Sequence, residues 1–202
     1  MTHPQPQLID LPQVKAWQGI LPRYPLLSSN SAGWQGIHLE YHQQPAHDTP
    51  DYCFPSHLLS IGLGYRAKEF RANGRLYTDF VVGNVEICSA HQSLRTQAYG
   101  EAEFLLLAID KQFFNRADCE AVDDRPIELI PQVFGQDPLI YQMGLALKQE
   151  LEFNRQDSRL YAEAITTALA VHLIQRYSVH RTEIKQYSGG LPQSLLRPLI
   201  GQ

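Results

Sequence analysis

The sequence has few cysteines and no cysteine motif. The number of cysteines among 202 residues is odd: there are three, Cys53, Cys88 and Cys119. They lie far apart and form no CxxC pair. Disulfide-rich secreted domains and thiolate zinc sites both need paired or closely spaced cysteines. The chain therefore predicts neither, and we expect three idle thiols in a reducing compartment.

Long apolar runs and excess positive charge are also lacking. No segment approaches the roughly 18 apolar residues of a membrane span, and Met1–Pro6 has no basic start followed by an apolar stretch. These absences predict a soluble, cytoplasmic protein that does not contact the membrane. The net charge of −4 gives no positive field for phosphate backbones, so we expect these residues alone to bind DNA poorly.

Motifs of catalysis are missing as well. There is no nucleophile with a base and acid, no G-x-S-x-G and no glycine-rich phosphate loop. No H-x-H occurs, the spacing that places two imidazoles on one face of a strand to hold a metal. We therefore predict no catalytic residue, no cofactor and no enzyme.

Strand signals fill residues 34–109, where short apolar runs alternate with turns at intervals of about 8 to 12 residues. Apolar and polar residues alternate over 37–42, and 57–64 is an apolar strand that contains small residues. Asn73-Gly74 predicts a hairpin turn. Residues 104–109 are continuously apolar, which indicates a strand covered on both faces. We expect roughly seven strands.

Two helices are predicted after the strands. Asp137-Pro138 supplies an N-cap and a first-turn proline for a helix that ends near Phe153. Ser158 can cap a longer helix that reaches Tyr177. The middle of that helix is apolar almost all round, so one barrel surface cannot cover it. We infer that a second subunit or the partner helix covers the rest.

The last segment resembles a known junction. Residues 187–192 (YSGGLP), followed by Leu195 and Leu196, look like the sequence before the helix-turn-helix units of AraC/XylS transcription regulators. Residues 158–163 with 170–173, and FLLLAIDKQFF at 104–114, resemble the long helix and the last barrel strand of that family. The resemblance covers nearly all of the chain from Trp34 onward.

This resemblance implies an α+β fold, a cupin-like antiparallel β-barrel followed by two α-helices. It divides the chain into a sensing barrel with an N-terminal arm (1–126), a helical dimerisation segment (127–184), and a linker with the start of a DNA-binding domain (185–202). It implies a small-molecule effector of unknown identity and a homodimer. DNA would be bound only by residues after Gln202.

Candidate ligand-binding residues follow from the strands. His57 begins an apolar strand and is expected to point into the barrel with Leu59 and Leu63. Arg95 can pair bidentately with a carboxylate or phosphate, and His91 and Tyr99 lie nearby. The alternatives are a histidine that only bonds a neighbour and an exposed edge-strand arginine. Trp17 and Trp34 precede the barrel, where the family often has an arm over the ligand, although core or surface packing is the simpler explanation of either one.

Two further hypotheses concern metal and dimer. His38, Glu40 and His42 would share one face of a strand and form the nearest substitute for a cupin metal site, but alternating polar residues usually mark a solvated face. The dimer candidates are Leu160, Tyr161, Ile165, Leu169 and Leu173, which alternatively pack only on the barrel. The rival to a regulator is therefore a stand-alone cupin enzyme or a metal-binding sensor.

Overall fold

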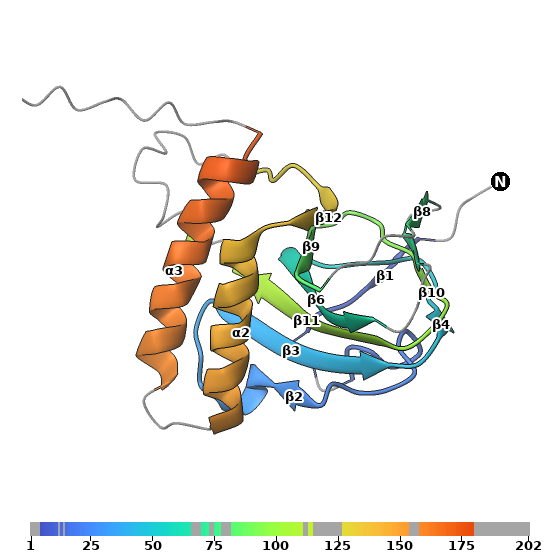
Figure 1. Ribbon diagram of the computed structural model, residues 1–202, viewed down its shortest axis with the longest axis horizontal. Helices are drawn as coiled ribbons and strands as arrows, with labels where there is room; N and C mark the ends of the chain where they lie inside the picture. The colour runs from blue at the N-terminus through green and yellow to red at the C-terminus, as the bar shows by residue number, and fades with distance from the viewer. Residues whose placement is uncertain are drawn as a thin grey trace, which may run out of the picture.

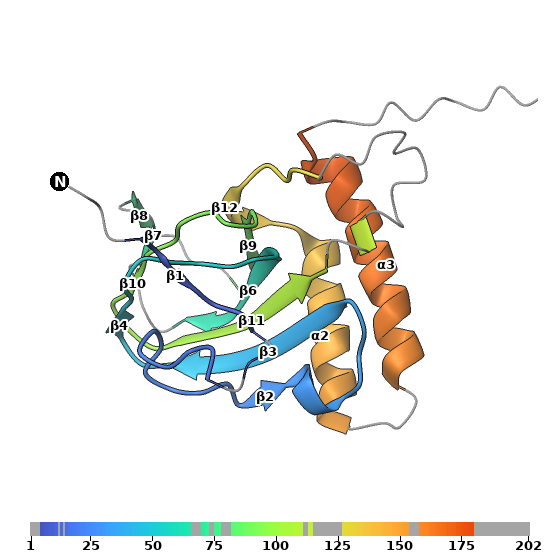
Figure 2. The same cartoon turned by 180° about the vertical axis from the view of Figure 1, so that it is seen from behind.

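The computed structural model describes residues 5–11, 13, 15–65, 70–72, 75–77, 82–110, 113–114, 127–153 and 158–179. Within these residues, strands form one large sheet and two small ones, and two helices follow. α2 (Pro138–Phe153) and α3 (Ser158–Tyr177) stand together on one side of the barrel, and the short strands β4 (His47–Asp48) and β10 (Thr96–Ala98) lie on the opposite side (Figures 1 and 2). The predicted α+β class, an antiparallel barrel followed by two α-helices, is confirmed.

The main sheet has six strands in the order β12-β9-β6-β11-β3-β2, and every neighbouring pair is antiparallel. β11 lies near its centre, in register with β3 from Ala102↔Gln44 to Ile109↔Ile37. This central place explains why β11 is apolar on both faces. The strands are β2 (Leu27–Ser28), β3 (Ile37–Gln44), β6 (His57–Tyr65), β9 (Asn84–Cys88), β11 (Ala102–Ile109) and β12 (Gln132–Gln136).

Shorter strands close the other side of the barrel. Four form a sheet in the order β4-β10-β7-β8, and β1 pairs with β5 in parallel. Their bounds are β1 (Gln7–Leu8), β4 (His47–Asp48), β5 (Tyr52–Cys53), β7 (Phe70–Ala72), β8 (Arg75–Tyr77) and β10 (Thr96–Ala98). The pairing of Ala72 with Arg75 confirms the predicted hairpin, whose turn at 73–74 lies outside the described residues. The described part of 34–109 holds nine strands rather than seven, because β4 and β5 have two residues each and are too short to show a period.

The helices begin and end where the sequence predicts. α2 spans Pro138–Phe153 and α3 spans Ser158–Tyr177. Asp137 caps α2, since its Oδ1 accepts bonds from the backbone N–H groups of Leu139 and Ile140, each at 3.1 Å. Its Oδ2 accepts from His172 Nε2 (2.8 Å) and the Tyr177 hydroxyl (2.7 Å). One carboxylate therefore joins the start of α2 to the end of α3.

Two cores lie on opposite faces of the six-stranded sheet. Leu39, Leu59 and Leu107 point toward α2 and α3, and Gly144 lets α2 approach so closely that an added Cβ would lie 2.5 Å from Ile61 Cδ1. The other face packs against the N-terminal segment, short strands and loops, and its core contains Ile9, Leu11, Trp17, Ile20, Phe54, Leu58 and Leu106. The sheet is therefore buried on both faces.

The predicted domain boundaries stay predictions. β12 lies beyond residue 126, yet it pairs with β9 in the main sheet, so the barrel sheet continues past that point. Residues 185–202, the predicted linker, lie outside the described residues. Among the described helices, none is both long enough and apolar enough to span a membrane.

Candidate functional site

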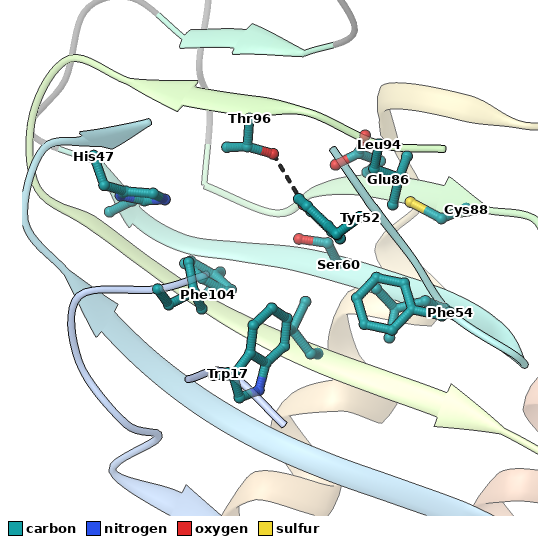
Figure 3. A pocket seen from close by; sticks show the side chains of 14 residues that line it. Trp17, His47, Tyr52, Phe54, Ser60, Glu86, Cys88, Leu94, Thr96 and Phe104 are labelled. Atoms are coloured by element: carbon teal, nitrogen blue, oxygen red, sulfur yellow. Dashed lines mark hydrogen bonds between the residues drawn. The ribbon is translucent and has the colours of Figure 1, made fainter. Parts of the chain in front are cut away.

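A cavity with about 50 Å³ of free volume lies inside the barrel, on the face of the main sheet that points away from the helices (Figure 3). Strands β6, β9 and β11 form one wall, and His47 and Thr96 come from the four-stranded sheet. Trp17 and Leu21 enter from the N-terminal segment. Barrel interiors with mainly apolar walls and a few polar groups are typical small-molecule sites, so this cavity is the candidate site.

Aromatic rings make up much of the cavity wall. Trp17 and Phe54 meet edge to face with centroids 5.9 Å apart, and Tyr52 meets Phe54 at 5.6 Å. Phe104 stacks on His42 at 5.2 Å from the neighbouring strand. Such contacts fix the rings against one another, so the wall is largely preformed.

Several polar groups interrupt this wall. The Tyr52 hydroxyl is hydrogen-bonded to Thr96 Oγ1 at 3.0 Å. Ser60 and Glu86 are register partners on β6 and β9 and both line the cavity. Among the described residues, none forms a hydrogen bond or ion pair with the Glu86 carboxyl.

The titratable groups of the cavity favour their neutral forms. Burial raises the pKa of Glu86 to about 7, because no charge or donor compensates the lost hydration. Burial also raises the pKa of the Tyr52 phenol and of the Cys88 thiol. The pKa of His47 is lowered by burial, against a hydrogen bond to the Pro45 carbonyl. With a pKa of about 7, the Glu86 carboxyl changes charge near neutral pH.

Behind the aromatic wall, β3 carries a buried hydrogen-bonded relay. Glu40 Oε1 lies 3.1 Å from His38 Nε2, and Glu40 Oε2 lies 3.0 Å from His42 Nε2. Trp17 Nε1 donates to Oε2 at 2.5 Å. Gln44 Nε2 donates to His42 Nδ1, which leaves the Nε2 proton of His42 for Glu40.

These bonds control the ionisation of Glu40. Burial opposes the charge, but the hydrogen bonds from His38, His42 and Trp17 outweigh it and lower the pKa of Glu40 to about 2. The expectation of a solvated face for these residues is wrong, since the exposed fractions of His38, Glu40 and His42 are 9%, 3% and 0%. The N-terminal segment covers this face, and strand alternation alone cannot reveal such a cover.

The relay does not fit a metal ion. Both Glu40 oxygens are already bonded, and each histidine directs Nε2 at the carboxylate rather than at a common point. Over the described ranges, no three His, Cys, Asp or Glu side chains are placed to hold a metal ion. The relay instead anchors Trp17 over the cavity.

The predicted ligand residues do not line this cavity. His57 lies on the helix-facing side of β6, where Nε2 bonds the Ile127 carbonyl (3.0 Å) and Nδ1 accepts from the Ala90 N–H (3.3 Å). The expectation that it points into the barrel is therefore wrong. Arg95 faces outward beside Asp48, and His91 and Tyr99 are exposed. These three belong to the segment that forms the wall, but they do not line the cavity.

Strand parity explains the error. Leu94 and Thr96, on either side of Arg95, face the cavity, because successive side chains of an extended segment point to opposite sides. The same alternation along β6 points Ser60 into the cavity and Leu59 toward the helices. Glu86 carried a usable signal, since it is a lone acid in the apolar stretch Val85–Cys88.

The two tryptophans lie at different places in the fold, and the dimer candidates differ in burial. Trp17 is in the cavity wall, whereas Trp34 Nε1 donates to Ser158 Oγ at the start of α3. Leu160 and Tyr161 are 75% and 46% exposed. Leu169 and Leu173 are fully buried in the core between helices and sheet, and Ile165 is partly buried against the same core. The predicted interface role is therefore wrong for Leu169 and Leu173.

No protein-family model and no curated protein sequence matches the chain. Solved cupin structures are similar to part of it. A cupin superfamily protein of Desulfitobacterium hafniense is 14% identical over 52% of this chain and 93% of its own, with a TM-score of 0.35. A cupin-2 domain protein of Shewanella frigidimarina is 7% identical over 43% and 80%, with a TM-score of 0.34.

The EutQ protein of Clostridium difficile is 8% identical over 36% of this chain, with a TM-score of 0.31. The match spans 56% of the EutQ chain, little more than half of its length. Similarities this low transfer no ligand or activity to this chain. The fold is the α+β arrangement described above, an antiparallel barrel followed by two helices.

Proposed function

We propose that this chain is the effector-sensing and dimerising part of a transcription regulator of the AraC/XylS type, and not an enzyme. The barrel cavity would bind a small molecule, α3 would pair two copies, and a separate domain would contact DNA. The cavity closed by Trp17 is the observation that carries this proposal. It offers a small, mainly apolar space with a few polar groups.

The N-terminal segment supports a sensing role. Backbone bonds from Gln7 N to Asp51 O and from Ile9 N to Cys53 O fix its first part beside β5. Farther along, Trp17 contributes both to the cavity wall and to the bond with Glu40. A ligand that moves Trp17 would therefore alter how this segment packs. Effector binding shifts an equilibrium only if it favours one such arrangement.

A binding screen tests the sensing part. Thermal shifts of the protein are measured with a panel of small metabolites, for wild type and for Ser60→Leu, which fills the cavity. A ligand at 100 times its dissociation constant stabilises by about 2.7 kcal/mol, enough to detect. We expect at least one ligand to stabilise wild type and not Ser60→Leu. Stabilisation of both proteins by every active compound would refute the cavity site.

The dimer part rests on the exposed apolar residues of α3. Leu160 and Tyr161 protrude from its first turn, and Ala164 and Ala168 continue the exposed face. We expect sedimentation equilibrium to give a dimer that Tyr161→Glu dissociates. Tyr24→Glu is the matched control, because Tyr24 is 60% exposed on a different surface. A wild-type monomer at high concentration, or equal effects of both substitutions, would contradict the proposal.

The alternative function is a metal-binding cupin sensor or enzyme. The buried His38–Glu40–His42 relay favours it in one respect, because histidine and carboxylate side chains are common metal ligands. Its bonding argues the other way, since Glu40 already accepts three hydrogen bonds. Elemental analysis of the purified protein separates the two. Stoichiometric iron, zinc, nickel or manganese that disappears in a His38→Ala, His42→Ala double variant would favour the rival.

A further inference from the structure

Glu86 differs from the other acidic groups inside the barrel. Glu40 accepts bonds from two histidines and a tryptophan, whereas no described residue pairs with Glu86. The part of the cavity lining that the structure describes contains no lysine or arginine. An unpaired carboxylate in such a place is costly, and a cationic partner from outside the chain would remove that cost.

The rest of the wall suits the apolar part of a cation. Trp17, Tyr52 and Phe54 contact one another edge to face along one side of the cavity, and Figure 3 shows them with Glu86 around the same space. Aromatic rings attract organic cations through the negative charge of their faces. Carboxylate and aromatic rings together form a setting for an ammonium group.

The free volume limits the size of this cation. A buried water needs about 10 to 15 Å³ of such space, so the 50 Å³ here holds about three to five non-hydrogen atoms. We propose that the cavity selects a small alkylammonium ion whose charge pairs with Glu86 and whose alkyl groups pack on the aromatic wall. This inference rests on the proposed function, because it names the class of effector that the barrel would bind.

Ionisation of Glu86 adds a pH signature. The other titratable groups described around the cavity are His47 on β4, Tyr52 on β5 and Cys88 on β9. Burial lowers the pKa of His47 and raises the pKa of Tyr52 and Cys88, so it favours the neutral form of each. With the pKa of Glu86 at about 7, a permanent cation should bind about 30-fold more weakly at pH 5.5 than at pH 8.

The test uses tetramethylammonium and tert-butanol, which have the same shape and number of heavy atoms but differ in charge. Binding is measured by calorimetry at matched ionic strength for wild type, Glu86→Gln and Glu128→Gln. Glu128 is exposed and does not line the cavity, so its substitution changes the net charge equally. We expect tetramethylammonium to bind wild type at least tenfold more tightly than tert-butanol, and Glu86→Gln to lose this preference while Glu128→Gln keeps it.

Several results would overturn the inference. These are equal binding of the two probes, no binding of tetramethylammonium, equal effects of the two substitutions, and affinity for the cation that does not change between pH 5.5 and pH 8. The pH series needs no variant, so misfolding of Glu86→Gln cannot obscure it. The proposed function is judged separately by the metabolite screen with Ser60→Leu, because a neutral ligand found there would preserve the sensor and refute only the cation.

Discussion

Replacing Glu86 by glutamine should remove a pH dependence from the stability of the protein. The side chain lies in the cavity wall without a described partner, and burial raises its pKa from the ordinary 4.5 to about 7. Between these two values the folded protein keeps a proton that the unfolded chain has released. The free energy of unfolding therefore decreases as pH rises from 4.5 to 7 and is level above that range.

The size of the effect follows from the same two values. A pKa raised from 4.5 to about 7 corresponds to about 3 kcal/mol of stability lost across this range. Glutamine has nearly the shape of the protonated acid and does not ionise. Glu86→Gln should therefore match wild type near pH 4.5 and exceed its stability by about 3 kcal/mol at pH 8.

Urea unfolding at pH 4.5 and pH 8, followed by tryptophan fluorescence, measures this difference. Glu128→Gln serves as the control, since exposed substitutions usually change stability by less than about 0.5 kcal/mol. If the difference between Glu86→Gln and wild type were the same at both pH values, the Glu86 carboxyl would be well solvated. The reasoning about an uncompensated acid would then be refuted.

Three other variants test separate parts of the fold by the same unfolding assay. Glu40→Gln should lower the free energy of unfolding by about 3 kcal/mol at pH 7, because the Glu40 pKa of about 2 stabilises the folded protein above pH 4.5. This stabilisation vanishes as pH falls toward 2. If the unfolding free energies of wild type and variant ran parallel from pH 4.5 to 2, the prediction would be contradicted. Asp137→Ala should cost about 2 to 4 kcal/mol, since it removes the α2 cap and the bonds to α3, and a cost under 1 kcal/mol would show that these bonds contribute little. Leu173→Ala should cost about 2 to 5 kcal/mol and Leu160→Ala, measured at concentrations where the protein is monomeric, less than about 0.5 kcal/mol; similar costs would mean that the two residues do not differ in burial as described.

Much of the local structure could be predicted from the sequence. The cap at Asp137 and the apolar spacing after it located α2, and the continuous apolar run at 104–109 identified the central strand β11. The dimer candidates were harder, because Leu173 and Leu160 lie on the same broad stripe. Only the packing of α3 against the sheet separates the buried residue from the exposed one.

The candidate site depended on contacts between distant segments. Periodicity assigns two faces to a strand but does not tell which face meets a cavity, and here both faces of the main sheet are buried. This is why His57 was expected to point into the barrel but lies on the face of the sheet that packs against the helices. It is also why Arg95 points outward while its sequence neighbours Leu94 and Thr96 line the cavity.

The sequence by itself determined that a strand region precedes two helices and where those helices begin and end, because these features follow from local spacing, caps and turn residues. The tertiary structure decided the rest. It placed Trp17 over the barrel and onto Glu40, and it left Glu86 facing the cavity without a described partner. Such pairings join residues more than twenty positions apart, and no local pattern encodes which distant side chain will meet another.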